Sequence, residues 1–209
     1  KKMFKHFVLY IEACFSGSMA IDFPEDLGIS IVTAANHQES SWGWYCGDEA
    51  VVKGKDIGSC LGDEFSVFWM EDTDKGEQKT ETLEEQWNRI HAGVTKSHAS
   101  RYGDKSFSAD LIGEYVGYPA KKTYEQVSEE AWDSRDSKFL YLRHKYLTTT
   151  GEEKKKYEAL YNEELSLRQQ YDRYFNSIAK EDRLYSTQTG PVKNFNCYKQ
   201  GIEQMEKIF

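Results

Sequence analysis

The sequence predicts an α/β portion followed by an all-helical portion. Two segments near the N-terminus, residues 6–13 and 28–35, are short, rich in β-branched and apolar residues and bounded by turn residues, as strands of an α/β sheet are. Beyond Pro119 the apolar residues recur at helical spacing instead. We therefore predict three parts, which cover residues 1–118 (α/β portion), 119–135 (a linker rich in Ser and Asp) and 136–209 (helical portion).

The first predicted strand is expected to lie in the core. Its run Phe7–Ile11 is continuously apolar, which is typical of a strand buried on both faces. Gly17 and Pro24 then interrupt the chain, as a strand–loop–helix connection requires. Only a short basic segment precedes the strand, so we expect the sequence to be a fragment whose earlier strands lie upstream.

Two helices are predicted after the second strand. The first covers residues 63–72, where Phe65, Phe68 and Trp69 fall at helical spacing. The second follows a possible capping box, in which the side chains of Thr82 and Glu85 satisfy the first backbone amides. Its apolar positions are Leu83, Trp87, Ile90 and Val94. We expect both apolar stripes to pack in the core rather than to bind a cofactor, and no cofactor is predicted.

The helical portion contains three predicted helices. Phe139, Leu142 and Tyr146 mark the first. A longer, otherwise charged helix follows, with an apolar face made of Tyr157, Leu160, Tyr161, Leu165, Tyr171, Tyr174, Phe175 and Ile178. The last helix is expected after Pro191.

Composition excludes several classes of partner. A chain of 209 residues with 39% hydrophobic content can form a folded core. Its net charge of −8 argues against a nucleic-acid or anionic-membrane partner, because the lysines alternate with glutamates and form no basic face. No apolar run approaches the roughly 18–20 residues of a membrane span, and the N-terminus lacks the order of a signal peptide. We therefore expect no nucleic-acid and no membrane partner.

Cys14 is the candidate nucleophile. It ends the first predicted strand and is followed by the small residues Ser16, Gly17 and Ser18. A cysteine at such a strand tip can stand exposed, with backbone N–H groups of the next turn nearby to hold an oxyanion. A buried structural cysteine is the alternative, since free cysteine is among the most buried residue types.

Five motifs in order resemble the legumain family of cysteine peptidases, also called asparaginyl endopeptidases or vacuolar processing enzymes. They are Glu12-Ala13-Cys14 with Ser16-Gly17-Ser18-Met19, Thr33-Ala34-Ala35-Asn36, Glu39-Ser40-Ser41-Trp42-Gly43, Cys60-Leu61-Gly62-Asp63 and Ser66-Val67-Phe68-Trp69-Met70-Glu71-Asp72. The similarity continues through residues 97–103 and into Ser134-Arg135-Asp136, which resembles the start of the family's prodomain. It is closest to the plant-type members.

The resemblance implies a caspase-like α/β domain followed by a death-domain-like helical prodomain that covers the active site until it is removed at acid pH. Cys14 matches the family nucleophile. Glu12 and Asp63 match acidic walls of the pocket for the substrate asparagine, and Ser40 and Ser41 match residues that line the cleft. An asparagine carboxamide presents two N–H donors and one acceptor, so acidic acceptors suit one side of such a pocket. The substrates implied are proteins and peptides.

Two parts of the family's machinery are missing from this sequence. The family's catalytic histidine and pocket arginine both precede the cysteine strand, and none of the five histidines, His6, His37, His91, His98 and His144, matches that histidine. We therefore predict that the 209-residue chain alone is inactive.

Phe15 also stands where the family typically has glutamate, which affects the pH profile and the leaving-group side of specificity. Met70 matches a cleft-edge position that influences the balance between hydrolysis and ligation, or else simply packs.

The remaining cysteines fit the same resemblance. Cys46 and Cys60 bracket a glycine-containing loop that resembles a plant-type insertion closed by a disulfide; zinc binding is the alternative, but the paired Cys-x-x-Cys spacing is absent, and no metal is predicted. Cys197 resembles a prodomain cysteine. The implied route is secretory, to a lysosome or vacuole, with the signal peptide outside this sequence.

Three functions are compatible with these residues. The first is a cysteine endopeptidase that cleaves after asparagine, and after aspartate at acid pH, made as a zymogen. The second is a peptide ligase or transamidase that uses the same site. The third is a catalytically inactive relative that acts as a binding or inhibitory module. An upstream His-Gly after a strand would separate the first two from the third.

Overall fold

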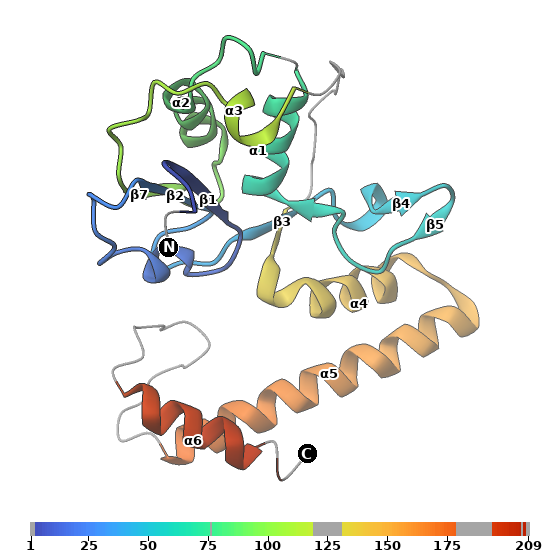
Figure 1. The fold of residues 1–209 in the computed structure, drawn as a ribbon. Coiled ribbons are helices and arrows are strands. Elements are labelled where there is room, and N and C mark those ends of the chain that lie inside the picture. The colour runs from blue at the N-terminus through green and yellow to red at the C-terminus, as the bar shows by residue number, and fades with distance from the viewer. Residues whose placement is uncertain (1–2, 76, 119–130, 179–193, 206, 208–209) are drawn as a thin grey trace.

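The computed structural model describes residues 3–75, 77–118, 131–178, 194–205 and 207. Its upper part contains strands and helices, and its lower part is helical (Figure 1). The mixed α/β character predicted for the first portion is thus confirmed.

The main sheet has the strand order β1-β2-β7. β1 (Phe7–Ile11) and β2 (Ile29–Thr33) run parallel, and β7 (Ser100–Gly103), which the sequence did not reveal, pairs antiparallel with β2. Because β1 and β2 are parallel, Cys14 and the segment after β2 leave the sheet at the same edge. The sheet therefore brings the Cys14 turn next to residues 36–41.

The prediction that β1 is buried on both faces is wrong for the described structure. Side chains alternate: Val8 and Tyr10 face the helices, whereas Phe7 and Leu9 are 43% and 37% exposed. The physical reason is that α2 covers only one face of the sheet at this strand (Figure 1). A continuous apolar run does not by itself distinguish this arrangement from full burial.

Helices α1 (Glu64–Asp74) and α2 (Leu83–Gly93) agree with the prediction, and a short α3 (Gly113–Val116) follows. The capping box of Thr82 and Glu85 is confirmed, with both reciprocal hydrogen bonds present. The apolar stripes do pack in the core. Its buried members are Val32, Ala34, Phe65, Ile90, Val94 and Ala99, with Tyr10, Phe68, Trp69 and Trp87 packed against them.

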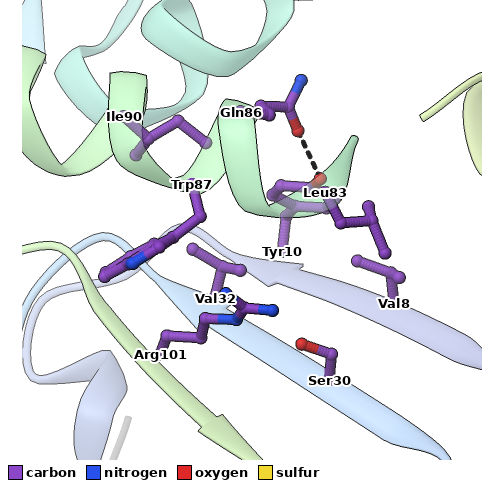
Figure 2. Close-up of a pocket in the computed structure, with 9 residues that line it drawn as sticks. All are labelled: Val8, Tyr10, Ser30, Val32, Leu83, Gln86, Trp87, Ile90 and Arg101. Atoms are coloured by element: carbon purple, nitrogen blue, oxygen red, sulfur yellow. Dashed lines mark hydrogen bonds between the residues drawn. The ribbon is translucent and has the colours of Figure 1, made fainter. Parts of the chain in front are cut away.

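A small gap remains between α2 and the sheet (Figure 2). Its volume of about 10 Å³ holds about one water molecule at most, so it is no ligand site. The hydroxyl of Tyr10 donates a hydrogen bond to Gln86 Oε1 at its edge, at 2.5 Å. Arg101 enters the gap from β7 and pairs with Glu84.

A second, small sheet has the order β6-β3-β8. Its strands are β3 (Trp42–Trp44), β6 (Gly62–Asp63) and β8 (Trp132–Asp133), and both pairings with β3 are antiparallel. β8 lies within the stretch predicted as linker, of which residues 119–130 fall outside the described part. This sheet joins the end of the linker to the α/β portion.

The segment between β3 and β6 forms a hairpin of β4 (Val51–Val52) and β5 (Lys55–Asp56). Its base is closed by a disulfide between Cys46 and Cys60. The loop that the resemblance singled out is therefore a cross-linked hairpin.

The helical part contains α4 (Ser137–Thr148), α5 (Gly151–Ile178) and α6 (Phe195–Met205), close to the predicted positions (Figure 1). α4 packs along α5, with Phe139 stacked on Tyr161. Beyond Arg168 the described side chains of α5 are exposed, among them Tyr171 and Tyr174 of the predicted apolar face; the side chains of Phe175 and Ile178 lie outside the described part. Among the described helices, none combines the length and the apolar character needed to cross a membrane.

Candidate active site

Cys14 lies just beyond the end of β1, half-buried, and its thiol faces Ser41. The backbone N–H of Ser41 donates to Cys14 Sγ at 3.3 Å, and Ser41 Oγ is 3.6 Å from the same sulfur. The thiol also faces the backbone oxygen of Ser41 at 3.8 Å, so both the backbone and the side chain of Ser41 fix its position at the end of the strand. This arrangement favours a functional cysteine over a buried structural one.

The turn after Cys14 does not offer the oxyanion donors expected from the sequence. Phe15 adopts φ 59°, and Ser16–Met19 form a 3₁₀ turn. The amides of this turn already have backbone acceptors: those of Phe15, Ser16, Gly17 and Ser18 donate to the oxygens of Glu39, Ala13, Ala35 and Phe15. The turn closes on itself and on the next loop, so the expectation that its N–H groups hold an oxyanion is wrong.

Glu12 lies behind Cys14 and reaches the start of α1. Its Oε2 accepts a hydrogen bond from the backbone N–H of Ser66 at 2.9 Å, while Oε1 is buried without a hydrogen-bond partner in the described part of the chain. Burial raises the pKa of Glu12 to about 7; the hydrogen bond to Ser66 opposes this shift, and the nearby charge of Asp63 adds to it. One carboxyl oxygen is thus fixed, and the other lacks a donor.

Asp63 ends β6 at the N-cap position of α1, but its side chain does not cap the helix. Instead Oδ1 accepts a hydrogen bond from the hydroxyl of Ser134 at 2.9 Å. Burial raises the pKa of Asp63, against the effect of that hydrogen bond. The carboxylate is therefore directed towards the segment that follows β8.

Ser40 and Ser41 are both buried just before β3. Ser41 Oγ donates to Ser134 Oγ at 3.4 Å and also interacts with Glu12. Ser41 therefore contacts Cys14, Glu12 and Ser134, and Ser134 in turn contacts Asp63, so these contacts link the predicted site residues. Ser40 lies at the margin of this group and hydrogen-bonds to Asp133.

The segment Trp132–Arg135 lies across this site. Asp133 pairs with Trp42 in the antiparallel ladder, and the N–H of Ser134 donates to the oxygen of Ser41 at 3.1 Å. Arg135 follows at once, with its guanidinium 5.0 Å from the ring centre of Phe15. Because Asp133 pairs with β3, the next side chain, that of Ser134, lies beside Asp63. The side chain of Arg135 then lies over Phe15, in the turn that follows Cys14.

The five histidines are all described, and none hydrogen-bonds to Cys14. His6 bonds to Asp110, His98 to Glu39 and His144 to Asp48, each on the periphery, while His91 lies 3.3 Å from the oxygen of Ala99. Met70, on α1, is 44% exposed. Within the described residues, no group of His, Cys, Asp or Glu could hold a metal ion.

Sequence reasoning missed the part of Ser134 and Arg135 in this site. In the sequence, Ser134-Arg135-Asp136 resembles only the start of a prodomain. Its place in the site depends on the pairing of β8 with β3, whose two-residue strands have no readable periodicity. Glu64 was also missed: buried at the start of α1, it accepts hydrogen bonds from the N–H groups of Thr95 and Lys96 and fixes that loop.

Residues 1–118 match the model of the peptidase C13 family. The chain belongs to the peptidase C13 family. It is 38% identical, over 69% of its length, to the vacuolar-processing enzyme delta-isozyme of Arabidopsis thaliana. It is 31% identical, over 95% of its length, to the vacuolar-processing enzyme beta-isozyme 1 of Oryza sativa subsp. indica, and 32% identical, over 73%, to the legumain of Canavalia ensiformis.

These relatives confirm the resemblance to plant-type legumains that the motifs indicated. The chain spans 34%, 46% and 35% of the length of the three relatives.

Proposed function

We propose that the protein is a cysteine endopeptidase that cleaves peptide bonds after asparagine, with Cys14 as the nucleophile. One observation carries this proposal. A peptide strand paired with β3 inserts a small polar side chain, that of Ser134, between Asp63 and Ser41, which itself contacts the thiol of Cys14. A substrate strand bound in the same way would place its side chain beside both carboxyls and its backbone beside the nucleophile.

The polar groups of the site suit a carboxamide. Asp63 Oδ1 already accepts a hydrogen bond from the Ser134 hydroxyl, and Glu12 Oε1 has no donor among the residues that the structure describes. The NH₂ group of an asparagine side chain could donate to Asp63, and the carboxamide could pair with Glu12 Oε1 in either state, by donating to the carboxylate or by accepting from the protonated acid. Leaving a buried carboxyl oxygen unpaired is costly, so an aliphatic side chain of the same size would bind less well. Proteins and peptides are therefore the proposed substrates.

The base for Cys14 is expected from outside these 209 residues. Since none of the five histidines of the chain hydrogen-bonds to the thiol, the 209-residue chain by itself should be inactive. An upstream histidine and a pocket arginine, as the resemblance implies, would complete the site.

The helical part is proposed to act as an intramolecular inhibitor with a death-domain-like fold. β8 and Ser134 occupy the place proposed for substrate, and they continue directly into α4. The chain bends into a 3₁₀ turn at Ser134–Asp136, away from the strand path, so the segment is bound without the extended geometry of a substrate. The protein would thus be made as a zymogen. The names of its relatives support a secretory route to a vacuole or lysosome.

Two alternatives use the same residues. A ligase or transamidase would transfer the acyl group from Cys14 to an amine rather than to water, and an inactive relative would bind peptide strands on β3 without cleaving them. No nucleic-acid or membrane partner is proposed. Product analysis in the presence of a peptide amine separates the ligase from the hydrolase.

The decisive experiment uses the full-length protein that carries this chain, after acid activation. Peptides that differ only in Asn, Gln or Leu before the scissile bond should be cleaved only when Asn is present. Cys14→Ser should abolish turnover, whereas Cys197→Ser, at the other free and exposed cysteine, should leave it intact. Turnover that survives Cys14→Ser would reject the proposal.

A further inference from the structure

Glu39 connects the turn that follows Cys14 to the neighbouring loops. Its backbone oxygen accepts a hydrogen bond from the N–H of Phe15, the residue after the nucleophile, at 2.7 Å. Further along the same loop, the N–H and the hydroxyl of Ser41 lie 3.3 and 3.6 Å from the Cys14 sulfur. The loop of residues 36–41 therefore contacts both the thiol and the backbone behind it, so the position of this loop sets the position of the nucleophile.

The carboxylate of Glu39 fixes this loop in place. Its Oε1 accepts hydrogen bonds from the N–H of Asn36 at 3.0 Å, which closes the start of the loop, and from the N–H of His98 at 2.8 Å. Its Oε2 lies 2.8 Å from Nδ1 of His98. One side chain thus ties the 36–41 loop to the segment that precedes β7.

The segment that carries His98 is itself anchored. The N–H groups of residues 95–96 donate to the buried carboxylate of Glu64 at 2.9 and 3.0 Å, at the start of α1. The hydroxyl of Ser97 donates to the oxygen of Ala34, just after β2, at 2.6 Å. The tie to Glu39 therefore connects the loop beside the nucleophile to both α1 and the main sheet.

The Glu39–His98 pair carries opposite charges over the acid range. The hydrogen bond and the charge of Glu39 raise the pKa of His98. Burial raises the pKa of Glu39, but hydrogen bonds from Asn36 and His98 outweigh burial, and the pKa is lower than that of a free glutamate. The attraction is therefore complete between about pH 4.5 and 6.5, and it is lost as the pH rises through the raised pKa of His98.

Other titratable groups belong to the elements around this pair. They are His37, His91, Lys96, Glu64 and Arg101. Glu64 binds backbone amides, Arg101 pairs with Glu84, and His91 lies at the oxygen of Ala99. The charged group that shifts the pKa of His98 is Glu39.

We infer that Glu39 is a positioning residue for the Cys14 nucleophile and that protonated His98 strengthens this positioning. The inference rests on the proposed function and adds a reason for the enzyme to work in acid. Both side chains act through the backbone of the 36–41 loop, whereas the carboxylate of Asp63, proposed to bind the asparagine side chain, is directed towards Ser134. Loss of the tie should therefore lower kcat more than it changes KM.

The first test measures kcat and KM per titrated active site, on one asparagine peptide, in the acid-activated full-length protein. Glu39→Ala should lower kcat about tenfold at pH 5 and change KM by less than about twofold, because a small displacement of a reacting group costs much of the rate. Glu39→Gln keeps an acceptor for the two backbone amides and should recover most of the loss. His6→Gln is the matched control, since His6 also pairs with a carboxylate, that of Asp110, but at the far end of β1; its kcat should be unchanged.

A second test isolates the charge of His98. The ratio of kcat in the unaltered protein to kcat in His98→Gln should be about two- to fourfold at pH 5, the size of an exposed ion pair, because the His98 side chain is 79% exposed. The ratio should fall towards one at pH 7.5. Because the two proteins share their other titrating groups, those groups cancel in the ratio.

The outcomes separate this inference from the proposed function. A Glu39→Ala protein that unfolds at a lower temperature but keeps its kcat overturns the positioning role, and a kcat ratio for His98→Gln that does not change with pH overturns the part of His98; cleavage after asparagine stands in both cases. If Glu39→Ala does not fold, Glu39→Asp, which withdraws the carboxylate by one methylene, provides the same comparison. Failure of the unaltered protein to cleave any asparagine peptide overturns the proposed function and this inference with it.

Discussion

At the scale of single residues, two neighbouring carboxyl groups behave differently from free acids. Glu12 and Asp63 both have raised pKa values because they are buried, and the Asp63 charge adds to the shift of Glu12, whose pKa is about 7. In acid Glu12 is therefore largely neutral, and Asp63 takes up its proton at a higher pH than a free aspartate does. These protonation states decide which substrate side chains the site accepts at a given pH.

The first prediction concerns aspartate substrates. A substrate aspartate brings a second negative charge next to Asp63, so it must be protonated to bind. Free aspartate titrates near pH 3.9, and a nearby carboxylate raises that value, so cleavage after aspartate should appear as the pH falls towards about 4–5. Paired Asn and Asp peptides measured from pH 4 to 7 should show a steep rise in the Asp/Asn ratio of kcat/KM on acidification.

Asp63→Asn is the matched variant for this prediction. It removes the charge at nearly constant shape, so the Asp/Asn ratio should become flatter with pH, and cleavage after asparagine should weaken by about tenfold for one lost charged hydrogen bond. A pH-independent ratio in the unaltered protein would remove Glu12 and Asp63 from the specificity pocket.

The candidate site could be predicted only in part from the sequence. Cys14, Glu12, Ser41 and Asp63 are predicted site residues because they lie in motifs, and in the structure contacts through Ser41 and Ser134 link them. Ser134 was not found, because its partner Asp63 is 71 positions away and a serine in a linker has no distinguishing chemistry. The turn after Cys14 was misjudged because its hydrogen bonds depend on the loop at Glu39.

At the scale of elements, the β4–β5 hairpin depends on its cross-link. Cys46 is fully buried and the disulfide spans 14 positions at the base of the hairpin. Gly43 in β3 lies so close that an added Cβ would come within 2.7 Å of Cys60 Sγ. The disulfide therefore packs directly against the strand that is proposed to bind substrate.

We predict that the double variant Cys46→Ser/Cys60→Ser lowers the free energy of unfolding by about 3 kcal/mol, the value expected for a closed loop of this size. Denaturant unfolding of protein prepared under oxidising conditions measures this. Cys197→Ser, at an exposed cysteine, is the control and should have little effect. Peptide mapping without reduction that found Cys46 and Cys60 as free thiols would contradict the prediction.

The ends of α1 and α2 enclose a buried pair of acids. Asp72 and Glu81 are each 3% exposed, and one oxygen of each lacks a hydrogen-bond partner among the described residues. Burial, together with the hydrogen bond and charge of Asp72, raises the pKa of Glu81 to about 8, although Arg89 at 2.7 Å opposes the shift. A proton on Glu81 lets the two carboxyl groups hydrogen-bond to each other.

This pair should make the domain more stable in acid. The pKa of Glu81 is higher in the folded state than its ordinary value of 4.5, so its stabilising contribution is complete below about pH 4.5 and is lost as the pH rises towards 8. The expected loss between pH 5 and 8 is on the order of 2 kcal/mol. Thermal unfolding should show a falling midpoint over this range.

Glu81→Gln keeps a donor for Asp72 at every pH and should remove the part of this dependence that comes from Glu81; the part that comes from Glu12, whose pKa is raised to about 7, should remain. Glu77→Gln is the control, because Glu77 also contacts Arg89, at 3.0 Å, but is half-exposed. Equal pH dependence in the unaltered protein and in Glu81→Gln would show that the acid pair does not control stability.

At the scale of the whole molecule, the helical part is held to the α/β part by contacts beside the disulfide hairpin as well as by β8. Lys145 of α4 pairs with Asp56 of β5 at 2.9 Å, and His144 lies 3.2 Å from Asp48. Burial raises the pKa of Asp56, but the hydrogen bond from Lys145 outweighs burial, and the pKa is lower than that of a free aspartate. This ion pair therefore stays charged at pH values at which a free aspartate is already protonated. Mild acid alone therefore leaves this ion pair intact.

The helices themselves were predictable, whereas their attachment was not. α4, α5 and α6 follow from helical periodicity and from Pro191. β8 joins the second sheet through two residues, and no pattern of two residues identifies a strand. Which part of α5 is covered likewise depends on where α4 packs, which helical spacing does not specify.

The last prediction is that cutting the linker and activating the enzyme are separable events. An engineered protease site between residues 121 and 125 would sever the chain but leave β8 paired with β3, Ser134 in the site and Lys145 on Asp56. The cut protein should therefore remain nearly inactive on asparagine peptides at pH 5 until the helical part is separated from it. Gel filtration before and after mild denaturant, with activity measured on each fraction, tests this. The variant Lys145→Ala should release the helices more readily and raise the activity of the cut protein, because it removes an ion pair that acid leaves in place. Full activity immediately after cutting, with the helices still bound, would show that β8 and Ser134 do not block the site.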